Sequence, residues 1–425
     1  MKIEQLHQIF LESNGVCTDT RKITKGCLFF ALKGDNFNGN EFSQEALNKG
    51  AYKVVIDQIN YHKNTGETIL YGNSLKLLQK LAAYHRKHLN LPIIAITGSN
   101  GKTTTKELIH AVLAKKFNTT ATRGNLNNHI GVPLTLLEMT SETEIGIVEM
   151  GANHLKEIET LCEIAQPDFG YITNFGKAHL EGFGSLEGVI QGKSELYKHL
   201  LNNDKLVFVN GNDAKQMEIT KPMNRITFGN EQQDKYVKLN DASGMLELEY
   251  KGMVIKSHLI GLYNFHNIAA AVAIGDYFEV PVEKIKEAIE EYIPSMNRSQ
   301  IIEKNGIRII LDAYNANPTS MMAAIENFEQ TEGEKLLILG DMFELGSEAK
   351  TEHQAIVDYL EKQEVGDVYL VGENFFETKV SSETIQLFKT FENLQAFLNQ
   401  QSISQKQLLI KGSRGMALER VLDLI

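Results

Sequence analysis

A glycine-bearing loop, TGSNGKTTT at residues 97–105, constrains the fold of this chain more than any other feature of its sequence. The loop follows an apolar run at residues 91–97 and precedes Thr103–Phe117, where apolar residues recur at helical spacing. A strand, a glycine loop and a helix in this order bind phosphate, because backbone N–H groups and the amino end of the helix point at the anion. A chance glycine turn before a helix is the alternative. The loop therefore predicts a nucleotide site on a parallel α/β sheet.

The residues of the loop have distinct expected roles. Lys102 would meet the β- and γ-phosphate oxygens of the nucleotide, and the hydroxyl of Thr103 would face Mg2+. The other nucleotide-binding residues expected here are Gly98, Ser99, Asn100, Gly101 and Thr104. Loops of this kind usually carry a glycine five residues before the glycine of the Gly-Lys pair, and this chain has Ile96 there. The loop is thus a shorter variant.

The remainder of the chain from about residue 91 alternates short Ile-, Val- and Leu-rich runs with stretches of helical period. This alternation is typical of parallel sheets covered by crossover helices, and it occurs in two blocks. The expected strands are residues 91–97, 144–150, 168–174 and 205–210 in the first block, and 307–315, 335–341, 367–372 and 407–413 in the second. Ligands of such sheets bind at the carboxyl ends of the strands.

Three domains are expected in a chain of 425 residues. Residues 1–88 form a small N-terminal α/β domain, with a strand in GCLFFAL and a helix near Ser74–His88. Residues 89–295 form a central parallel-sheet ATPase domain around the phosphate-binding P-loop. Residues 296–425 form a C-terminal Rossmann-like α/β domain, and the proline-bearing stretch 293–300 marks the boundary.

Composition excludes several classes of protein. A net charge of −11 argues against nucleic acid as the main partner, because phosphate backbones are bound through clustered Lys and Arg. The amino terminus lacks the apolar core of a signal peptide, and no apolar run is long enough to cross a bilayer. We expect a cytoplasmic protein without membrane insertion, acting as a monomer. Cys17, Cys27 and Cys162 lack metal-binding spacing and are expected to be plain thiols.

Nine further motifs, spread over nearly the whole chain, allow a closer comparison. They are RGNLNNHIGVPLTLL (123–137), EMGANHLKEI (149–158), TNFGKAHLEGFGS (173–185), GKSEL (192–196), GLYNFHNIAAAVAI (261–274), NR (297–298), LDAYNANPTSM (311–321), LGDMFELG (339–346) and KGSRGMALE (411–419). With the short P-loop, this set resembles the Mur ligase family of amide-bond-forming enzymes. The EMGA, DAYNANP and GDMFELG forms resemble the branch that adds D-alanyl-D-alanine. The resemblance implies an ATP- and Mg2+-dependent ligase that joins D-alanyl-D-alanine to UDP-N-acetylmuramoyl-tripeptide.

The resemblance also implies a catalytic and metal site. Glu149 and His179 end candidate strands near the P-loop, where a carboxylate and an imidazole suit Mg2+, although structural roles are the alternative. Lys193 in QGKSEL matches a lysine that the family carries as a carbamate formed with CO2; an ordinary ammonium is the alternative. The implied catalytic residues are Lys102, His179 and Lys193, and the implied metal ligands are Thr103, Glu149, His179 and Lys193.

Further nucleotide contacts are implied outside the P-loop. Asn267 is expected to bind the adenine edge, while Asn264, three residues earlier, has the plainer role of a helix cap. Arg298 would reach the phosphates of ATP and Asp312 its ribose, with a surface salt bridge as the alternative reading.

Substrate contacts are implied at both ends of the chain. The segment 17–42 resembles the uridine-nucleotide-binding start of these ligases, with Asp19, Thr20 and Arg21 matching an Asp-Ser-Arg triplet. Asn38-Gly39-Asn40 departs from the Asp-Gly-His usual in the family. The residues expected around the peptide and dipeptide are Asn127, Asn315, Asn317 and Pro318, together with Asp341 and Met342.

Three other functions compete with this one. The ligase of the same family that adds the third peptide residue usually lacks the EMGA, DAYNANP and GDMFELG forms. A P-loop kinase or hydrolase of a nucleotide-sugar pathway would explain the loop but not the N- and C-terminal motifs. A non-catalytic binding protein is disfavoured because Lys102, Glu149, His179 and Lys193 are all chemically competent.

Overall fold

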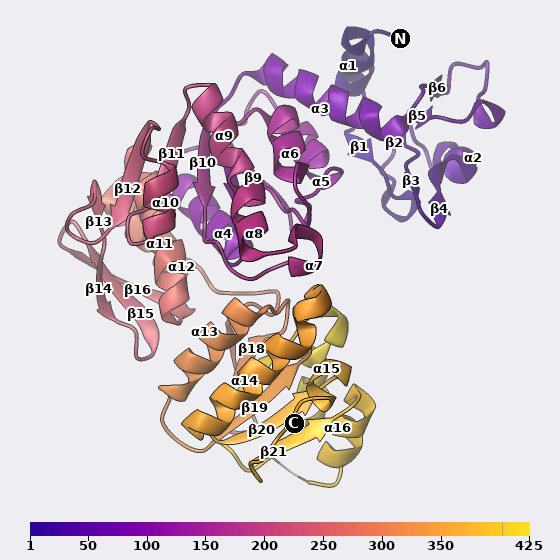
Figure 1. The fold of residues 1–425 in the computed structure, drawn as a ribbon. Coiled ribbons are helices and arrows are strands. Elements are labelled where there is room, and N and C mark those ends of the chain that lie inside the picture. Colours follow the sequence, from indigo (N-terminus) through magenta and orange to yellow (C-terminus); the bar gives the residue numbers. More distant parts are fainter. Residues whose placement is uncertain (402) are drawn as a thin grey trace.

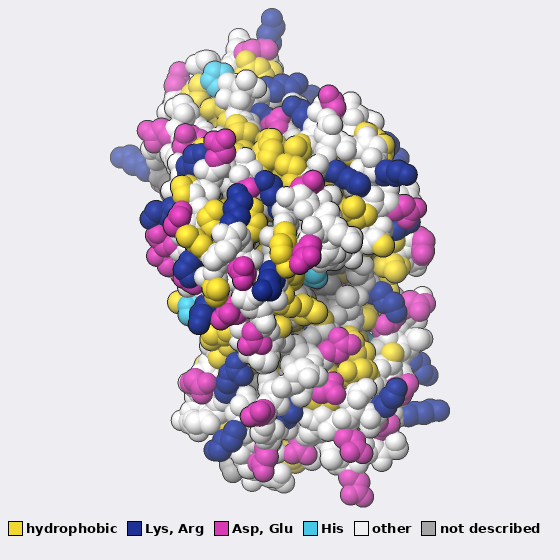
Figure 2. Space-filling view, turned by 90° about the vertical axis from the view of Figure 1, so that its left-hand side faces the viewer, with side chains coloured by type: hydrophobic (Ala, Val, Ile, Leu, Met, Phe, Trp, Pro, Cys, Tyr) yellow, Lys and Arg dark blue, Asp and Glu magenta, His cyan; other side chains and the backbone are white. Residues whose placement is uncertain are grey.

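The computed structural model describes residues 1–401 and 403–425. The chain forms three α/β units that follow one another in sequence order, from the N-terminal unit through the central one to the C-terminal one (Figure 1). This arrangement confirms the expected fold class. Acidic and basic side chains are interspersed on the face that Figure 2 shows, so that this face offers no extended basic surface for a nucleic acid.

The N-terminal unit is built on a small parallel sheet with strand order β1-β2-β5-β6. Its strands are β1 (Val16–Cys17), β2 (Leu28–Phe30), β3 (Lys33–Gly34), β4 (Phe37–Asn38), β5 (Lys53–Ile56) and β6 (Thr68–Leu70), of which β3 and β4 form a separate hairpin. Its helices are α1 (Ile3–Glu12), α2 (Ser43–Asn48) and α3 (Ser74–Leu89). Cys17 and Cys27 are buried and free here, as is Cys162 further along, in agreement with the thiols expected.

Helix α3 joins the N-terminal unit to the central one. It begins where the side chain of Asn73 accepts a hydrogen bond from the Lys76 N–H, and it ends at Asn90, which is left-handed. Near its end, Arg86 donates to the carbonyl of Ala165 at 3.0 Å and pairs with Asp168 at 2.6 Å. Helix α3 therefore packs against α1 and β2 in the N-terminal unit and is bonded to Ala165 and Asp168 in the central unit.

The central unit contains a seven-stranded parallel sheet with order β13-β12-β11-β10-β7-β9-β8. Its strands are β7 (Ile93–Thr97), β8 (Thr119–Ala121), β9 (Ile145–Glu149), β10 (Phe169–Ile172), β11 (Leu206–Asn210), β12 (Arg225–Gly229) and β13 (Lys235–Tyr236). Its helices are α4 (Lys102–Leu113), α5 (Gly131–Leu137), α6 (Glu157–Ala165), α7 (Leu180–Phe183), α8 (Leu186–Lys193), α9 (Glu195–Asn202), α10 (Ala214–Ile219), α11 (Leu262–Tyr277) and α12 (Val282–Glu291).

Helices cover both faces of this sheet. Helices α4 and α11 pack on one face, and α5, α6 and α9 pack on the other. Strand β7 is consequently buried along its whole length, which is why the sequence shows a continuous apolar run there. All strands expected in the first block form. A second, antiparallel sheet of β14 (Lys238–Asp241), β15 (Met245–Tyr250) and β16 (Met253–Ile260) was not expected.

The C-terminal unit has a six-stranded sheet with order β17-β18-β22-β19-β20-β21, in which β17 is antiparallel to β18 and the other pairs are parallel. Its strands are β17 (Gln300–Lys304), β18 (Ile307–Asp312), β19 (Lys335–Gly340), β20 (Asp367–Val371), β21 (Ile385–Phe388) and β22 (Gln407–Lys411). Its helices are α13 (Pro318–Glu329), α14 (Ala349–Gln363), α15 (Glu373–Phe376) and α16 (Phe391–Leu398). Every strand expected in the second block forms. Within the described residues of all three units, no helix has the length and apolarity to cross a membrane.

His7 on α1 and His85 on α3 are buried where the two helices meet. The Nε2 atom of His7 is 3.0 Å from the Nδ1 atom of His85, whose Nε2 donates to the carbonyl of Met139 in the central unit. Burial, followed by the charges of His85 and His88, lowers the pKa of His7 to about 4, and burial also lowers the pKa of His85.

These histidines make stability pH-dependent. Because the folded-state pKa of His7 lies below the unfolded value near 6.5, the unfolded chain binds more protons in acid. The stabilising effect is present above about pH 6.5 and is lost as the pH falls toward about 4. We predict a smaller drop in thermal midpoint over this window for His7→Gln than for the unsubstituted protein. His258→Gln, at an exposed position, should match the unsubstituted protein. Equal drops in all three proteins would show that His7 is not responsible for the loss of stability in acid.

Candidate functional site

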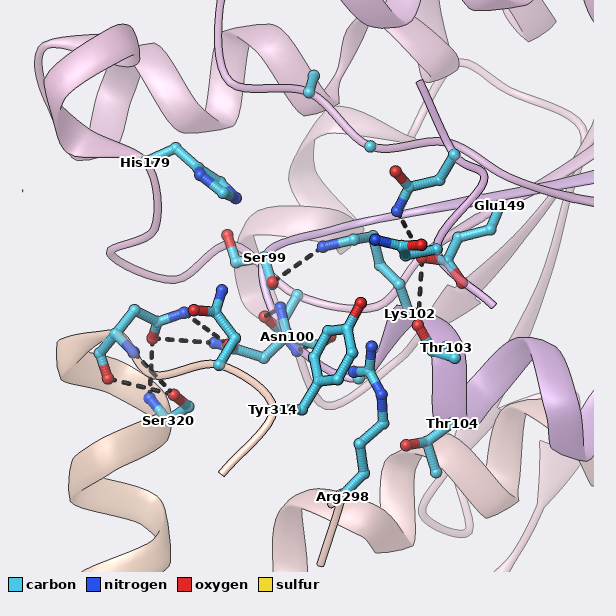
Figure 3. A pocket seen from close by; sticks show the side chains of 18 of the residues that line it. Ser99, Asn100, Lys102, Thr103, Thr104, Glu149, His179, Arg298, Tyr314 and Ser320 are labelled. Carbon is cyan, nitrogen blue, oxygen red and sulfur yellow. Dashed lines mark hydrogen bonds between the residues drawn. The ribbon is translucent and has the colours of Figure 1, made fainter. Parts of the chain in front are cut away.

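A cavity of about 620 Å3 lies between the central and C-terminal units. The central unit contributes the P-loop, the segments that follow β9 and β10, and the start of α11. The C-terminal unit contributes Arg298 and Ser299 just before β17, the segment from the end of β18 into α13, and the end of β22 (Figure 3). The cavity thus lies at carboxyl ends of parallel strands in both sheets, as open α/β sheets lead one to expect.

The P-loop is fixed by close backbone packing. Gly98 and Gly101 have φ values of 137° and 79°, which favour glycine. A Cβ atom on Gly98 would collide with Thr173 Oγ1, and one on Gly101 would lie 2.6 Å from Asn267 Oδ1. The Ser99 N–H also donates to the carbonyl of Asn174 at 3.1 Å. The loop is therefore preformed, with its backbone N–H groups at the amino end of α4.

Lys102 lies at the start of α4 and faces the cavity. Its Nζ atom donates to the carbonyls of Gly98 at 2.7 Å and Ser99 at 3.1 Å. Burial lowers the pKa of Lys102 to about 8, and the nearby negative charge of Glu149 opposes this shift. Among the described residues, the ammonium donates to backbone carbonyls alone, which it can exchange for phosphate oxygens.

Glu149 is a buried carboxylate with one oxygen unpartnered. It ends β9, is 1% exposed, and its Oε1 atom accepts hydrogen bonds from Asn127 Nδ2 at 2.8 Å and Thr103 Oγ1 at 3.2 Å. Its Oε2 atom has no hydrogen-bond partner among the described residues. An unpartnered buried carboxylate oxygen is energetically costly, and a cation would relieve that cost.

His179 lines the same cavity, and its ring points toward the P-loop side chains in Figure 3. Its Nδ1 atom is 2.5 Å from Glu344 Oε2 on the C-terminal unit. Within the described part of the chain, no three His, Cys, Asp or Glu side chains are grouped to hold a metal by themselves. The expected ligands therefore do not form an all-protein metal cage, and Mg2+ generally does not need one, since it usually takes one or two carboxylates plus substrate phosphates.

Lys193 lies behind the cavity wall instead of on its surface. It is 0% exposed, and its Nζ atom donates to the carbonyl of Ala152 at 2.9 Å, beside the ring of Phe183. Burial, then the charge of Lys102, lowers the pKa of Lys193 well below the ordinary value of 10.5. Ala152 itself lines the cavity, so the amine is one residue removed from it.

The C-terminal unit supplies a cationic wall. The guanidinium carbon of Arg298 is 3.6 Å from the centroid of the Tyr314 ring, and its Nε atom is buried without a partner in the described structure. Asp312 pairs through Oδ2 with Lys411 at 2.5 Å and accepts a hydrogen bond from the Ser299 N–H. Tyr314 and Lys411 were not assigned a role from the sequence, although both belong to motifs that begin at the ends of apolar strands.

The asparagines expected at the site are brought to the cavity. Asn267 accepts a hydrogen bond from Thr105 Oγ1, and Asn317 donates to Asn100 Oδ1 at 2.7 Å across the two units. No side chain caps α11, so the cap role considered for Asn264 is not observed. All the expected nucleotide residues line the cavity except Gly98, and so do Asn127, Asn315 and Asn317.

Three residues expected near the dipeptide do not line the cavity: Pro318, Asp341 and Met342. Asp341 and Met342 are only 2% and 1% exposed. The Asp341 carboxylate accepts hydrogen bonds from the N–H groups of Asn374 and Phe375 at the start of α15. It satisfies helix N–H groups, which a carboxylate after a strand can do as well as bind a ligand.

The N-terminal triplet lies elsewhere. Asp19, Thr20 and Arg21 are in the N-terminal unit and do not line the cavity. Arg21 pairs with Asp19 at 2.8 Å, and the Arg21 side chain is 86% exposed. These residues are free to contact a different part of a long substrate.

Comparison with known proteins agrees with this geometry. Residues 12–86 match the model described as Mur ligase family, catalytic domain; residues 96–275 match the Mur ligase middle domain; and residues 297–414 match the Mur ligase, glutamate ligase domain. The cavity is nevertheless lined by none of residues 12–86.

Individual relatives cover almost the whole chain. The UDP-N-acetylmuramoyl-tripeptide–D-alanyl-D-alanine ligase of Bacillus subtilis (strain 168) is 35% identical, covering 97% of this chain and 93% of that protein. A crystal structure of MurF from Acinetobacter baumannii has a TM-score of 0.87 and 31% identity, covering 100% of this chain and 98% of that one. MurF ligase from Thermotoga maritima in complex with ADP has a TM-score of 0.85 and 28% identity, covering 98% and 97%.

The close packing of Gly101 gives a direct test of the preformed loop. We predict that Gly101→Ala weakens ATP binding at least tenfold, because the added Cβ meets Asn267 and a left-handed alanine costs roughly 1–2 kcal/mol. Gly72→Ala is the matched control, since nothing lies within 4 Å of its added Cβ. Fluorescent-nucleotide titration measures both. Unchanged affinity in Gly101→Ala would show that the loop is not held as described.

Proposed function

The chain belongs to the Mur ligase family, and we propose that it joins D-alanyl-D-alanine to UDP-N-acetylmuramoyl-tripeptide with ATP as the energy source. The observation that carries this proposal is the cavity in which a preformed P-loop faces a C-terminal wall containing the DAYNANP residues. The near-complete coverage of relatives that bear this activity in their names supports it.

We infer that Mg2+ is held beside the P-loop. The Oε2 atom of Glu149 is buried and unpartnered, the Thr103 hydroxyl lies 3.2 Å from the other oxygen, and His179 lines the same cavity. This donor set fits a hard cation that also takes phosphate oxygens. When bound, Mg2+ would neutralise phosphate charge during transfer.

The residues of the chain suggest how the reaction proceeds. Lys102 would exchange its contacts with Gly98 and Ser99 for phosphate oxygens and stabilise the charge that develops there. The terminal carboxylate of the tripeptide attacks the γ-phosphate, giving an acyl phosphate and ADP. The amine of D-alanyl-D-alanine then attacks the acyl carbon, and phosphate leaves. The C-terminal wall shields these steps from water.

We propose that the three units divide the substrates among them. Residues 1–88 hold the uridine end through Asp19, Thr20 and Arg21, residues 89–295 hold ATP, and residues 296–425 hold the dipeptide near Asn315. ATP as a substrate is consistent with a reaction in the cytoplasm.

The proposed reaction is tested by phosphate release. We predict sustained release from ATP only when UDP-N-acetylmuramoyl-tripeptide and D-alanyl-D-alanine are both present, and a loss of several orders of magnitude in Lys102→Ala, which lacks the phosphate contact. Phosphate release with a nucleotide-sugar alone would indicate a hydrolase, and formation of ADP without phosphate release would indicate a kinase. Turnover with UDP-N-acetylmuramoyl-dipeptide and lysine or diaminopimelate would indicate the ligase that adds the third residue. Each of these results would overturn the proposal.

We further propose that Lys193 carries a carbamate. Its neutral amine would add to CO2 with release of a proton, and burial favours the neutral form that this addition requires. The product is a long-armed carboxylate suited to the metal side of the cavity. An ammonium would instead need a counter-charge, and among the described residues no carboxylate forms an ion pair with Nζ, which donates to the Ala152 carbonyl beside the Phe183 ring.

A carbamate and an ammonium at Lys193 predict different activities for the Lys193→Arg variant. We predict that Lys193→Arg is nearly inactive and that removal of CO2 slows the native enzyme reversibly. With 13C-labelled bicarbonate, the native protein should show a carbamate carbon signal that Lys193→Arg lacks. Circular dichroism checks that the variant folds. Substantial activity in Lys193→Arg, or no carbamate signal in the native protein, would refute the carbamate.

A further inference from the structure

The C-terminal unit contacts the segment 173–185 of the central unit, and this segment carries His179. Lys177 Nζ pairs with Glu352 at 2.5 Å. His179 Nδ1 lies 2.5 Å from Glu344 Oε2, a close charge contact whose angle does not yet meet hydrogen-bond geometry. Both carboxylates come from the other side of the cavity, yet only Glu344 touches a side chain that lines it next to the P-loop. Loss of the Glu344 contact should therefore affect the cavity, whereas loss of the Glu352 pair should affect only the interface between the two units.

The backbones of both His179 and Glu344 are held in an unusual conformation. Their φ values are 53° and 62°, in the left-handed region that residues other than glycine rarely adopt. The carbonyl of Glu344 accepts a hydrogen bond from the Glu181 N–H at 3.1 Å, directly beyond His179. A strained conformation persists where its surroundings determine it, and such positions cluster at functional sites. The segment around His179 and the segment around Glu344 are thus joined by a main-chain hydrogen bond as well as by the side-chain contact.

We propose that Glu344 is the positioning residue for His179: its carboxylate engages Nδ1 and leaves Nε2 as the nitrogen presented to a cation in the cavity. This proposal rests on the proposed function through the Mg2+ that the Glu149 side of the cavity would hold. A carboxylate on the far nitrogen of a ligating histidine fixes the tautomer and ring orientation and raises the basicity of the ligand. Glu344 belongs to the C-terminal unit, so the metal site is complete only when that unit is docked.

Glu352 provides the matched control. Glu352 also belongs to the C-terminal unit and also pairs with the segment 173–185, but its partner Lys177 is not an expected metal ligand. If the C-terminal carboxylates act only as a general clamp, removing either charge should have similar effects. If Glu344 orients His179, only its loss should change the affinity for metal. Glu→Gln keeps the side-chain length and the backbone in both cases.

The experiment uses the full chain and Mn2+ as the probe metal. Free Mn2+ is measured by electron paramagnetic resonance at saturating ADP, with the same Mn2+ and ADP mixture without protein as the baseline. We expect Glu344→Gln to weaken Mn2+ binding by about tenfold or more and to raise the Mg2+ concentration for half-maximal ligation by a similar factor. Glu352→Gln should remain within about twofold of the native protein in Mn2+ affinity.

Two outcomes would contradict the positioning role of Glu344. Native-like Mn2+ binding in Glu344→Gln, or equal weakening in Glu344→Gln and Glu352→Gln, would overturn the positioning role. Thermal midpoints of the two variants establish that both fold. Failure of the proposed function is seen separately, as absence of phosphate release by the native enzyme with both substrates. A native enzyme that ligates but binds no Mn2+ at this site would overturn the role of Glu344 without touching the ligase assignment.

Discussion

The candidate site depends on how closely the P-loop backbone approaches its neighbours. Gly98 lies against Thr173 after β10, and Gly101 lies against Asn267 on α11, and neither position has room for a Cβ atom. The loop, β10 and α11 therefore form one rigid support. Helix α4 starts from this support, so the direction of Lys102 and its distance from the carboxylate that ends β9 are set by packing before any ligand binds.

Much of the fold could be predicted because most strands are covered on both faces. Residues 336–339 are apolar without a break because β19 is buried on both faces, and such runs stand out in a sequence. The missed antiparallel sheet has a different pattern. In β15, Leu246, Leu248 and Tyr250 are buried and alternate with more exposed residues, a period of two that a search for continuous apolar runs does not detect.

The site was predicted less completely, for geometric reasons. A motif after a strand tells which edge of the sheet a residue is near, but not which way its side chain turns. Asp341 follows β19 and turns away to hold α15, whereas Lys411 ends β22 and turns into the cavity. The contact of Asn100 with Asn317 joins positions distant in the sequence, and it follows only from the docking of two units.

The place of β22 in its sheet has a consequence for the synthesis of the chain. This strand lies between β18 and β19, although it is the last to be made. Emerging chains fold from the amino end, so the N-terminal and central units can form while the middle of the C-terminal sheet is still missing. Lys411, which pairs with Asp312, arrives with that strand. A nascent chain therefore carries a finished P-loop before the opposing wall exists, and it cannot close around its nucleotide until β22 has joined the C-terminal sheet.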